Sequence, residues 1–283
     1  MTSPDSGSAP TGPQSIPDVP ADPEQARVAP EHPFTLAVDI GGTGLKASVL
    51  DARGAMVADR VKIATPYPLP PEKLAASLKK LIAPLPAAER AAVGFPGMVR
   101  GGVVLSAPHF VTVEGPGSET DHHLVHQWAK FDLAAALTAE FGIPTKVAND
   151  ADIQGAAVVK GTGLELVITL GTGFGTGLFY NGELLPHLEI AHQPFRKGED
   201  YDQQLGEATR KEIGETRWNK RVMKAIDHMR SLTLFDHLYI GGGNSRRVLH
   251  RHLPDDVTVV DNTAGILGGY RLWVPRHGGD PAD

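Results

Sequence analysis

The sequence has 283 residues, 41% of them hydrophobic and 21% charged, with a net charge of −6 and no cysteine. This composition excludes collagen-like, coiled-coil and disulfide-scaffold proteins, and it excludes zinc sites and nucleophiles built on cysteine. The negative charge argues against nucleic-acid and membrane partners, and no apolar run approaches the ~20 residues of a membrane span. The first residues do not resemble a secretory signal, so we expect a cytoplasmic protein.

Residues 1–33 contain eight of the 23 prolines and show no apolar periodicity. Such a segment buries too little surface to offset its ordering entropy, so we expect a disordered tail. A partner-docking segment is the weaker alternative.

The first part of the remaining chain is predicted to hold four strands and one helix. The strands are expected at 34–40, 45–50, 56–64 and 91–95. Glycines join the first two strands, which predicts a hairpin. Leu74, Leu78 and Leu81 recur at helical spacing and predict a helix over 70–82.

The second part alternates helices and strands. Helices are predicted at 131–141 and 150–159, a mostly helical stretch at 200–234, and a last helix at 263–273. Strands are predicted at 146–148, 164–170, 177–180, 237–240 and 257–260. Gly142 and Pro144 are stop signals for the helix before them, and Asn181-Gly182 is a hairpin turn signal.

Three glycine-rich turns each follow an apolar strand. They are Asp39-Ile40-Gly41-Gly42-Thr43-Gly44, the run Thr169-Leu170-Gly171-Thr172-Gly173 and its continuation to Gly177, and Gly241-Gly242-Gly243-Asn244. Glycine lets backbone N–H groups approach an anion, and successive N–H groups form a nest for phosphate oxygens. One such turn alone is more simply a hairpin. Three of them, two carrying threonine, favour phosphate binding.

Two other phosphate motifs are absent or misplaced. The chain has no G-x-x-x-x-G-K-[ST] motif, which excludes a P-loop. The glycines at 171–177 lie between two predicted strands, whereas the dinucleotide fingerprint needs a strand, a turn and then a helix.

The motifs resemble those of a known superfamily. Asp39-Ile40-Gly41-Gly42-Thr43 with Lys46, and Thr169-Leu170-Gly171-Thr172-Gly173, resemble the two phosphate motifs of actin-like ATPases and sugar kinases, and Gly241-Gly242-Gly243 resembles the adenosine motif. Val93-Gly94-Phe95-Pro96-Gly97, Asn149-Asp150-Ala151-Asp152 and Glu189-Ile190-Ala191-His192 resemble the ROK family of sugar kinases and repressors, nearest its polyphosphate glucokinase branch.

The resemblance implies a fold and an activity. The expected fold is α/β, the two-lobed actin-like ATPase (ribonuclease H-like) fold, with a cleft between lobes 34–143 and 144–283 and the last helix packing back on the first lobe. The expected activity is phosphoryl transfer from polyphosphate or ATP to the 6-hydroxyl of a hexose, with glucose expected first. A homodimer is implied as well.

The resemblance also assigns roles to residues. Asp150 matches the general base, and Gly97 and Asn149 match sugar-binding positions. The alternative is that Asn149-Asp150 only caps the next helix, because both residue types are favoured N-caps. Asp39 matches the acid that holds Mg²⁺ through water. Lys46 is expected either to reach a phosphate or to be a solvated strand lysine. The donor is expected at Gly41, Gly42, Thr43, Gly44, Gly171, Thr172, Gly173, Gly241, Gly242 and Gly243.

Glu189 and His192 match the family's sugar clamp, and spacing i, i+3 on a helical turn would put them on one face. A surface histidine is the alternative for His192. The family's zinc site needs three cysteines, so no zinc is expected here. Where the family has a second glutamate this chain has Pro194, which leaves one sugar contact missing or supplied by another group such as Gln193.

Two features remain open. The stretch 106–126 is rich in histidine and glycine and is expected to be a loop at the cleft edge. Basic residues between 196 and 224 are candidates for a polyphosphate track, although such charge is more often a solvated face. A ROK-type regulator is disfavoured by the short, proline-rich, acidic start, and a catalytically weak sugar-binding protein is the third alternative.

Overall fold

The structure is a computed structural model, and it describes residues 32–260 and 268–274. The described residues all belong to one compact unit, Glu31–Asp283. The predicted tail at 1–33 lies outside the described residues, apart from its last two.

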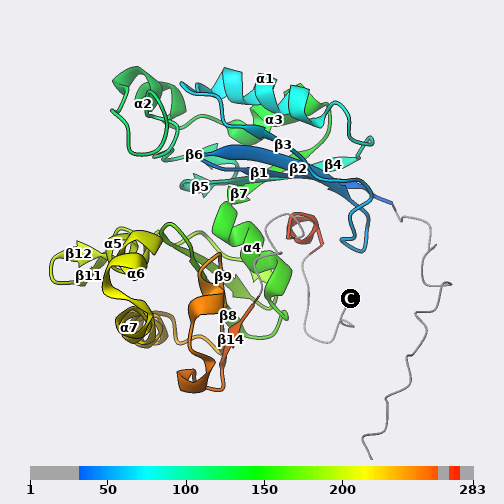
Figure 1. Cartoon of the computed structure of the whole chain (residues 1–283). Coiled ribbons are helices and arrows are strands. Elements are labelled where there is room, and N and C mark those ends of the chain that lie inside the picture. Colours follow the sequence, from blue (N-terminus) through cyan, green and yellow to red (C-terminus); the bar gives the residue numbers. More distant parts are fainter. Residues whose placement is uncertain (1–31, 261–267, 275–283) are drawn as a thin grey trace, which may run out of the picture. The chain divides into compact units, whose positions relative to one another are not determined.

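The first sheet has the order β3-β2-β1-β4-β7. Its strands are β1 (Thr35–Ile40), β2 (Gly44–Leu50), β3 (Val61–Ala64), β4 (Arg90–Phe95) and β7 (Thr145–Asn149). β1, β2 and β3 are antiparallel neighbours, as the glycine hairpin predicts, whereas β1, β4 and β7 run parallel. The helices α1 (Pro71–Ile82) and α3 (Leu133–Phe141) contact each other on one face of this sheet (Figure 1).

The second sheet has the order β10-β9-β8-β13-β14. Its strands are β8 (Leu164–Leu170), β9 (Phe174–Tyr180), β10 (Glu183–Leu184), β13 (His237–Gly241) and β14 (Val257–Val259). The helical stretch that follows β9 consists of α5 (Tyr201–Leu205), α6 (Glu207–Ile213) and α7 (Glu215–Thr233), after the small hairpin of β11 (Pro194–Arg196) and β12 (Glu199–Asp200). Each sheet has its own cluster of buried apolar side chains, and this burial is the main source of stability in each lobe.

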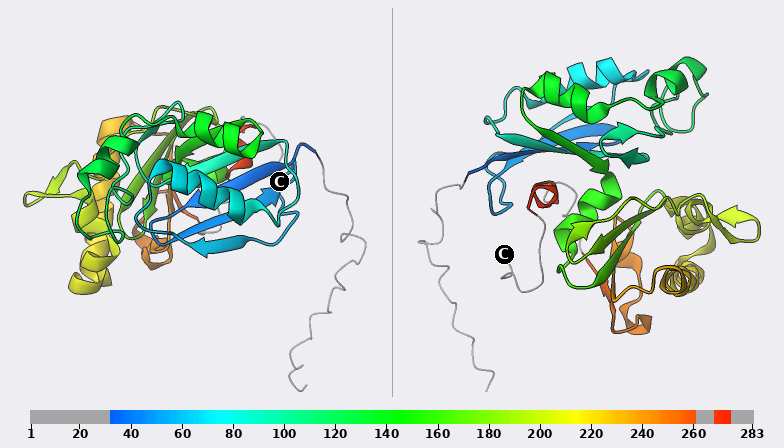
Figure 2. Two further views of the ribbon diagram at one scale, coloured as in Figure 1. Left: turned by 90° about the horizontal axis from the view of Figure 1, so that it is seen from above. Right: turned by 180° about the vertical axis from the view of Figure 1, so that it is seen from behind.

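Helix α4 (Asp150–Val158) connects the two sheets. It follows β7 directly and contacts β4 and β7 of the first sheet and β8 and β9 of the second (Figures 1 and 2). The start of α4 therefore lies where residues from both lobes meet.

The described C-terminal residues, 268–274, contact the first sheet. Trp273 donates its indole N–H to the carbonyl of Ala91 at 3.1 Å, and Tyr270 packs with Ala37 and Leu50. The last helix was expected at 263–273. Its residues 263–267 lie outside the described part, and the observed helical turn is the 3-10 segment η4 (Tyr270–Leu272).

Several elements differ from the expectations. β3 begins at Val61, because Met56 makes only an isolated bridge to Leu50. α3 begins at Leu133, where Asp132 caps it. β7 belongs to the first sheet, so this sheet extends past the expected lobe boundary at 143/144. The stretch 106–126 contains the start of an unexpected helix, α2 (His122–Trp128), and the short strands β5 (Val99–Arg100) and β6 (Val103–Val104) precede it.

Candidate active site

A cleft of about 660 Å³ takes its lining from both lobes. Eleven of the residues expected at the site line it: Lys46, Gly97, Asn149, Asp150, Gly171, Thr172, Gly173, Glu189, His192, Gly242 and Gly243. The other expected residues, Asp39, Gly41, Gly42, Thr43, Gly44 and Gly241, are not among the described lining residues. The structure thus gathers sugar-type and phosphate-type residues from distant segments into one cavity.

Asn149 and Asp150 lie where β7 passes into α4. The Asn149 side chain accepts from Ala151 N at 2.8 Å and donates to the Gly97 carbonyl at 3.0 Å. The capping alternative is therefore observed, and the same amide also fixes the turn after β4. Gly97 has to be glycine, because a Cβ there would lie 2.2 Å from the Ser106 carbonyl oxygen.

The Asp150 carboxyl has a raised pKa. Burial first, and then the nearby charges of Asp39 and Asp152, raise its pKa from 3.8 to about 6, against a hydrogen bond from Ala151 N. A carboxylate with a pKa close to neutral is a better proton acceptor than an ordinary aspartate and is still mostly ionised at pH 7.

Asp39 and Lys46 face each other across the first hairpin. The Lys46 ammonium donates to Oδ2 of Asp39 at 2.8 Å, and their side chains are 40% and 26% exposed. Lys46 is therefore paired with Asp39, and it also lines the cleft where a phosphate would bind. The glycine turn between them is held by side-chain hydrogen bonds from Thr65 to Gly41 O and from Tyr67 to Gly42 O.

The second and third glycine turns interlock. Gly242 has a φ of +87°, and a Cβ there would lie 2.4 Å from the carbonyl oxygen of Leu170. Asn244 donates through its backbone to Leu170 O at 2.8 Å and through its side chain to Gly171 O at 2.9 Å. The two turns are therefore hydrogen-bonded to each other where they line the cleft.

The segment with Glu189 and His192 forms one wall of the cleft. No helix forms there: residues 185–190 have no regular structure, and a turn closed by the hydrogen bond from Gln193 N to the Ile190 carbonyl follows at 191–192. Thr176 binds the Leu188 carbonyl, and Asp202 N binds the Ala191 carbonyl. Both side chains still reach the cleft. His192 is 62% exposed and lies 3.6 Å from Asp200.

The further polar side chains that line the cleft include His109, Gln154, His187 and Asp202. Spacing i, i+4 from Asp150 was an available signal for Gln154, and the histidine-rich stretch was a signal for His109. No local signal marks His187 or Asp202. Gln193 was considered as a substitute for the missing glutamate, but it is not among the residues lining the cleft, whereas Asp202 is.

Two of the basic residues between 196 and 224 pair with acidic neighbours. Arg210 lies near Glu207 and Glu215, and Lys211 pairs with Glu207 at 2.8 Å. None of these basic side chains is among the described residues that line the cleft.

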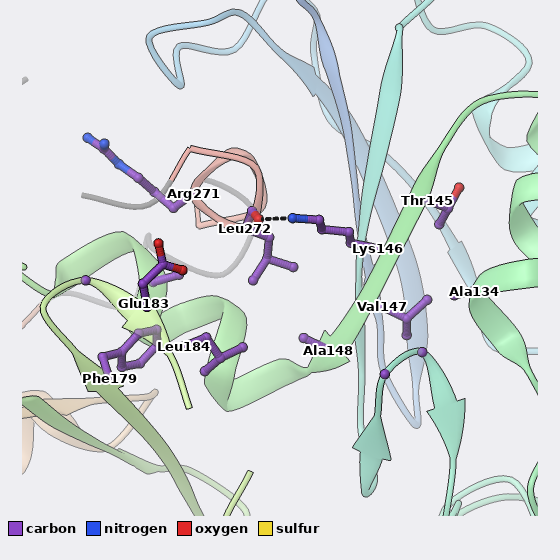
Figure 3. Close-up of a pocket in the computed structure, with 14 residues that line it drawn as sticks. Ala134, Thr145, Lys146, Val147, Ala148, Phe179, Glu183, Leu184, Arg271 and Leu272 are labelled. Atoms are coloured by element: carbon purple, nitrogen blue, oxygen red, sulfur yellow. Dashed lines mark hydrogen bonds between the residues drawn. The ribbon is translucent and has the colours of Figure 1, made fainter. Parts of the chain in front are cut away.

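A second cavity of about 350 Å³ lies among β7, α4, β10 and residues 271–272 (Figure 3). Its rim includes Lys146, which donates to the Leu272 carbonyl at 2.7 Å. None of the predicted site residues lines this cavity. The larger cleft is therefore the candidate active site.

The sequence profile of the ROK family matches residues 35–187, more than half of the chain. The chain belongs to the ROK family. The polyphosphate glucokinase of Mycobacterium tuberculosis is 27% identical over 246 residues, and the match covers 82% of this chain and 88% of that protein. The N-acetylmannosamine kinase of Escherichia coli is 36% identical over 157 residues, covering 53% of this chain and 49% of that protein.

Among solved structures, the inorganic polyphosphate/ATP-glucomannokinase of Arthrobacter sp. strain KM is similar. It has a TM-score of 0.68 and 29% identity, and the match covers 84% of this chain and 97% of that one. The expected two-lobed sugar-kinase fold is confirmed by this similarity.

Proposed function

We propose that this protein is a hexokinase-type kinase that transfers a phosphoryl group from polyphosphate or ATP to the 6-hydroxyl of a hexose, with glucose as the first substrate to test. The observation that carries the proposal is the single cleft in which Asp150 lies together with the two interlocked glycine turns. The relatives' names, a polyphosphate glucokinase and a polyphosphate/ATP-glucomannokinase, support the choice of donor and sugar.

The proposed chemistry follows from the two groups of residues in the cleft, one for the sugar and one for the phosphates. Asn149, Glu189 and His192, with the Gly97 turn, orient the sugar so that its hydroxyl meets Asp150. Asp150 accepts the hydroxyl proton as the oxygen attacks phosphorus, and its raised pKa suits that role. The glycine turns bind the phosphates through backbone N–H groups, and Lys46 adds a positive charge. Positioning supplies much of the rate in such a reaction.

Magnesium fits this site through few protein ligands. Mg²⁺ is usually held by one or two carboxylates together with waters and phosphates. Within the described residues, no group of three or more acidic or histidine side chains converges as metal ligands. Asp39 would hold the ion through water, and its repulsion of Asp150 marks a place where positive charge is favoured. When bound, Mg²⁺ would neutralise charge on the phosphates.

The family resemblance further supports a homodimer working in the cytoplasm, and we propose both. No helix in the described part of the chain combines the length and apolarity of a membrane crossing.

A steady-state kinetic survey tests the proposed function. Glucose, mannose, fructose, N-acetylglucosamine and N-acetylmannosamine are each paired with ATP and with polyphosphate, in the presence of Mg²⁺. We expect turnover with glucose and loss of it in Asp150→Asn, whereas Asp132→Asn, at the exposed start of α3, keeps it. No turnover with any pair would contradict the proposal. A preference for another hexose would correct only the substrate.

A further inference from the structure

His187 lies between two carboxylates in the wall of the cleft. Its Nδ1 is 3.2 Å from both carboxylate oxygens of Asp152 on α4, and its Nε2 is 3.7 Å from Oε2 of Glu189. The side chains of His187 and Asp152 are only 8% and 3% exposed. This histidine was not among the residues expected at the site.

The geometry favours a doubly protonated ring. An ionised carboxylate only accepts hydrogen bonds, and a neutral imidazole has one N–H to donate. Asp152 lies at hydrogen-bond distance from Nδ1 and Glu189 at ion-pair distance from Nε2, and the doubly protonated imidazolium presents an N–H to each of them.

The charges around the ring agree with this assignment. Burial opposes the charge on His187, but the hydrogen bonds and charges of Asp152 and Glu189 outweigh it and raise the pKa from 6.5 to about 9. In turn, His187 lowers the pKa of Glu189, and the charge of His192 lowers that pKa further. Burial raises the pKa of Asp152, and His187 opposes that rise. The negative charge of Asp152 also raises the pKa of Asp150.

We propose that His187 is a positioning residue for the sugar: as an imidazolium it fixes the Glu189 carboxylate in the cleft wall and neutralises Asp152 beside Asp150. The inference rests on the proposed function, because it assigns Glu189 to sugar binding. Without this cation, Glu189 would lose its anchor and Asp152 would be a buried charge without its partner, which proteins rarely tolerate.

Ring ¹⁵N NMR of histidine-labelled protein tests the charge without any need for catalysis. We expect one histidine with both nitrogens protonated at about pH 7.5. Its signal should vanish in His187→Gln and should titrate at lower pH in Asp152→Asn. A His187 ring that is neutral at that pH overturns the proposal, whatever the outcome of the kinase survey.

Kinetics tests the positioning role. His187→Gln should raise the KM for glucose by about tenfold or more while the KM for the donor stays within about twofold. His126→Gln, an exposed histidine on α2, is the matched control and should change neither. An equal rise in both KM values, or a fall in kcat with an unchanged glucose KM, would contradict a role in sugar positioning.

Asp152→Asn separates positioning from a purely structural role, and it decides the matter if His187→Gln does not fold. With one carboxylate gone, His187 should lose its charge at a lower pH. The kcat/KM for glucose should then fall between about pH 7 and about pH 8, where the wild type stays level because its His187 still holds the proton. A folded Asp152→Asn variant with the wild-type profile overturns the proposal.

Discussion

Asp150→Asn is expected to raise the free energy of unfolding near neutral pH, although it removes the proposed catalytic base. The wild-type carboxylate is held in a place that disfavours its charge, through burial and the neighbouring charges of Asp39 and Asp152. Asparagine has nearly the same shape and can still accept the hydrogen bond from Ala151 N. The variant therefore removes the unfavourable charge without removing the local contact.

The size of the gain follows from the pKa shift. The shift from 3.8 to about 6 is about 2 units, and one unit corresponds to about 1.4 kcal/mol. The upper value is therefore about 3 kcal/mol. Because Asp150 lines an open cleft and is partly exposed, water screens part of this cost, and we expect about 1 to 2 kcal/mol. For a chain of this size that is a rise in Tm of about 2 to 6 °C.

The stability gained by Asp150→Asn should depend on pH. The folded pKa is higher than the unfolded one, so the wild type gains stability from protonation as pH falls and loses it as pH rises through about 6. The advantage of Asp150→Asn should be full at about pH 7.5 and about half as large at about pH 5. Urea unfolding at both values measures it, with Asp132→Asn as the exposed control. A variant less stable than the wild type at the higher pH would refute this reasoning, as would a gain that does not shrink at the lower pH.

Three further results are expected. The kcat should fall below about pH 6, where Asp150 takes up its proton, and a rate that stays level to about pH 4.5 would argue against Asp150 as the base. Gly242→Ala should raise the donor KM at least about tenfold, because its methyl would meet the Leu170 carbonyl oxygen at 2.4 Å. Gly243→Ala, where an added Cβ meets nothing within 4 Å, should have the smaller effect, and the reverse order would be inconsistent with the interlocked turns. Asn149→Ala loses its helix cap and should lower the free energy of unfolding by about 1 to 2 kcal/mol in urea titration, whereas an unchanged value would mean that the cap contributes nothing.

Local pattern was sufficient for much of the fold. The hairpin of β1 and β2 follows from an apolar run, two glycines and a second apolar run, and no long-range information is needed. In α1, Leu74, Leu78 and Leu81 are buried as their spacing indicates. The start of β3 was expected too early, because only tertiary pairing decides where the ladder begins.

Sheet membership is not a local property. β7 was recognised as a strand, but nothing in residues 145–149 says that they pair with β4 rather than with the second sheet. The shape of the segment Glu189–His192 also depends on distant residues, because Thr176 and Asp202 hydrogen-bond to the backbone carbonyls of Leu188 and Ala191. Long-range contacts contribute in both cases.

The site residues that belong to a family motif could be predicted from the sequence. Asn149, Asp150 and residues of the second and third glycine turns line the cleft, and the family motifs were the signal for them. His187 was not predicted, because its meaning depends on Asp152, 35 residues away in sequence, and on a buried carboxylate that needs a cation. A sequence shows that such an acid is present, but only the fold shows which side chain compensates it.

Product analysis by ³¹P NMR tests the central claim most directly. Purified protein is mixed with glucose, Mg²⁺ and either polyphosphate or ATP, and the phosphorylated sugar is followed over time for the wild type and Asp150→Asn. The account predicts a sugar phosphate esterified at the 6-position, formed at least about 100-fold more slowly by the variant. Formation at the wild-type rate by Asp150→Asn would contradict the role of Asp150, and no phosphorylated hexose from any sugar and donor would contradict the kinase itself.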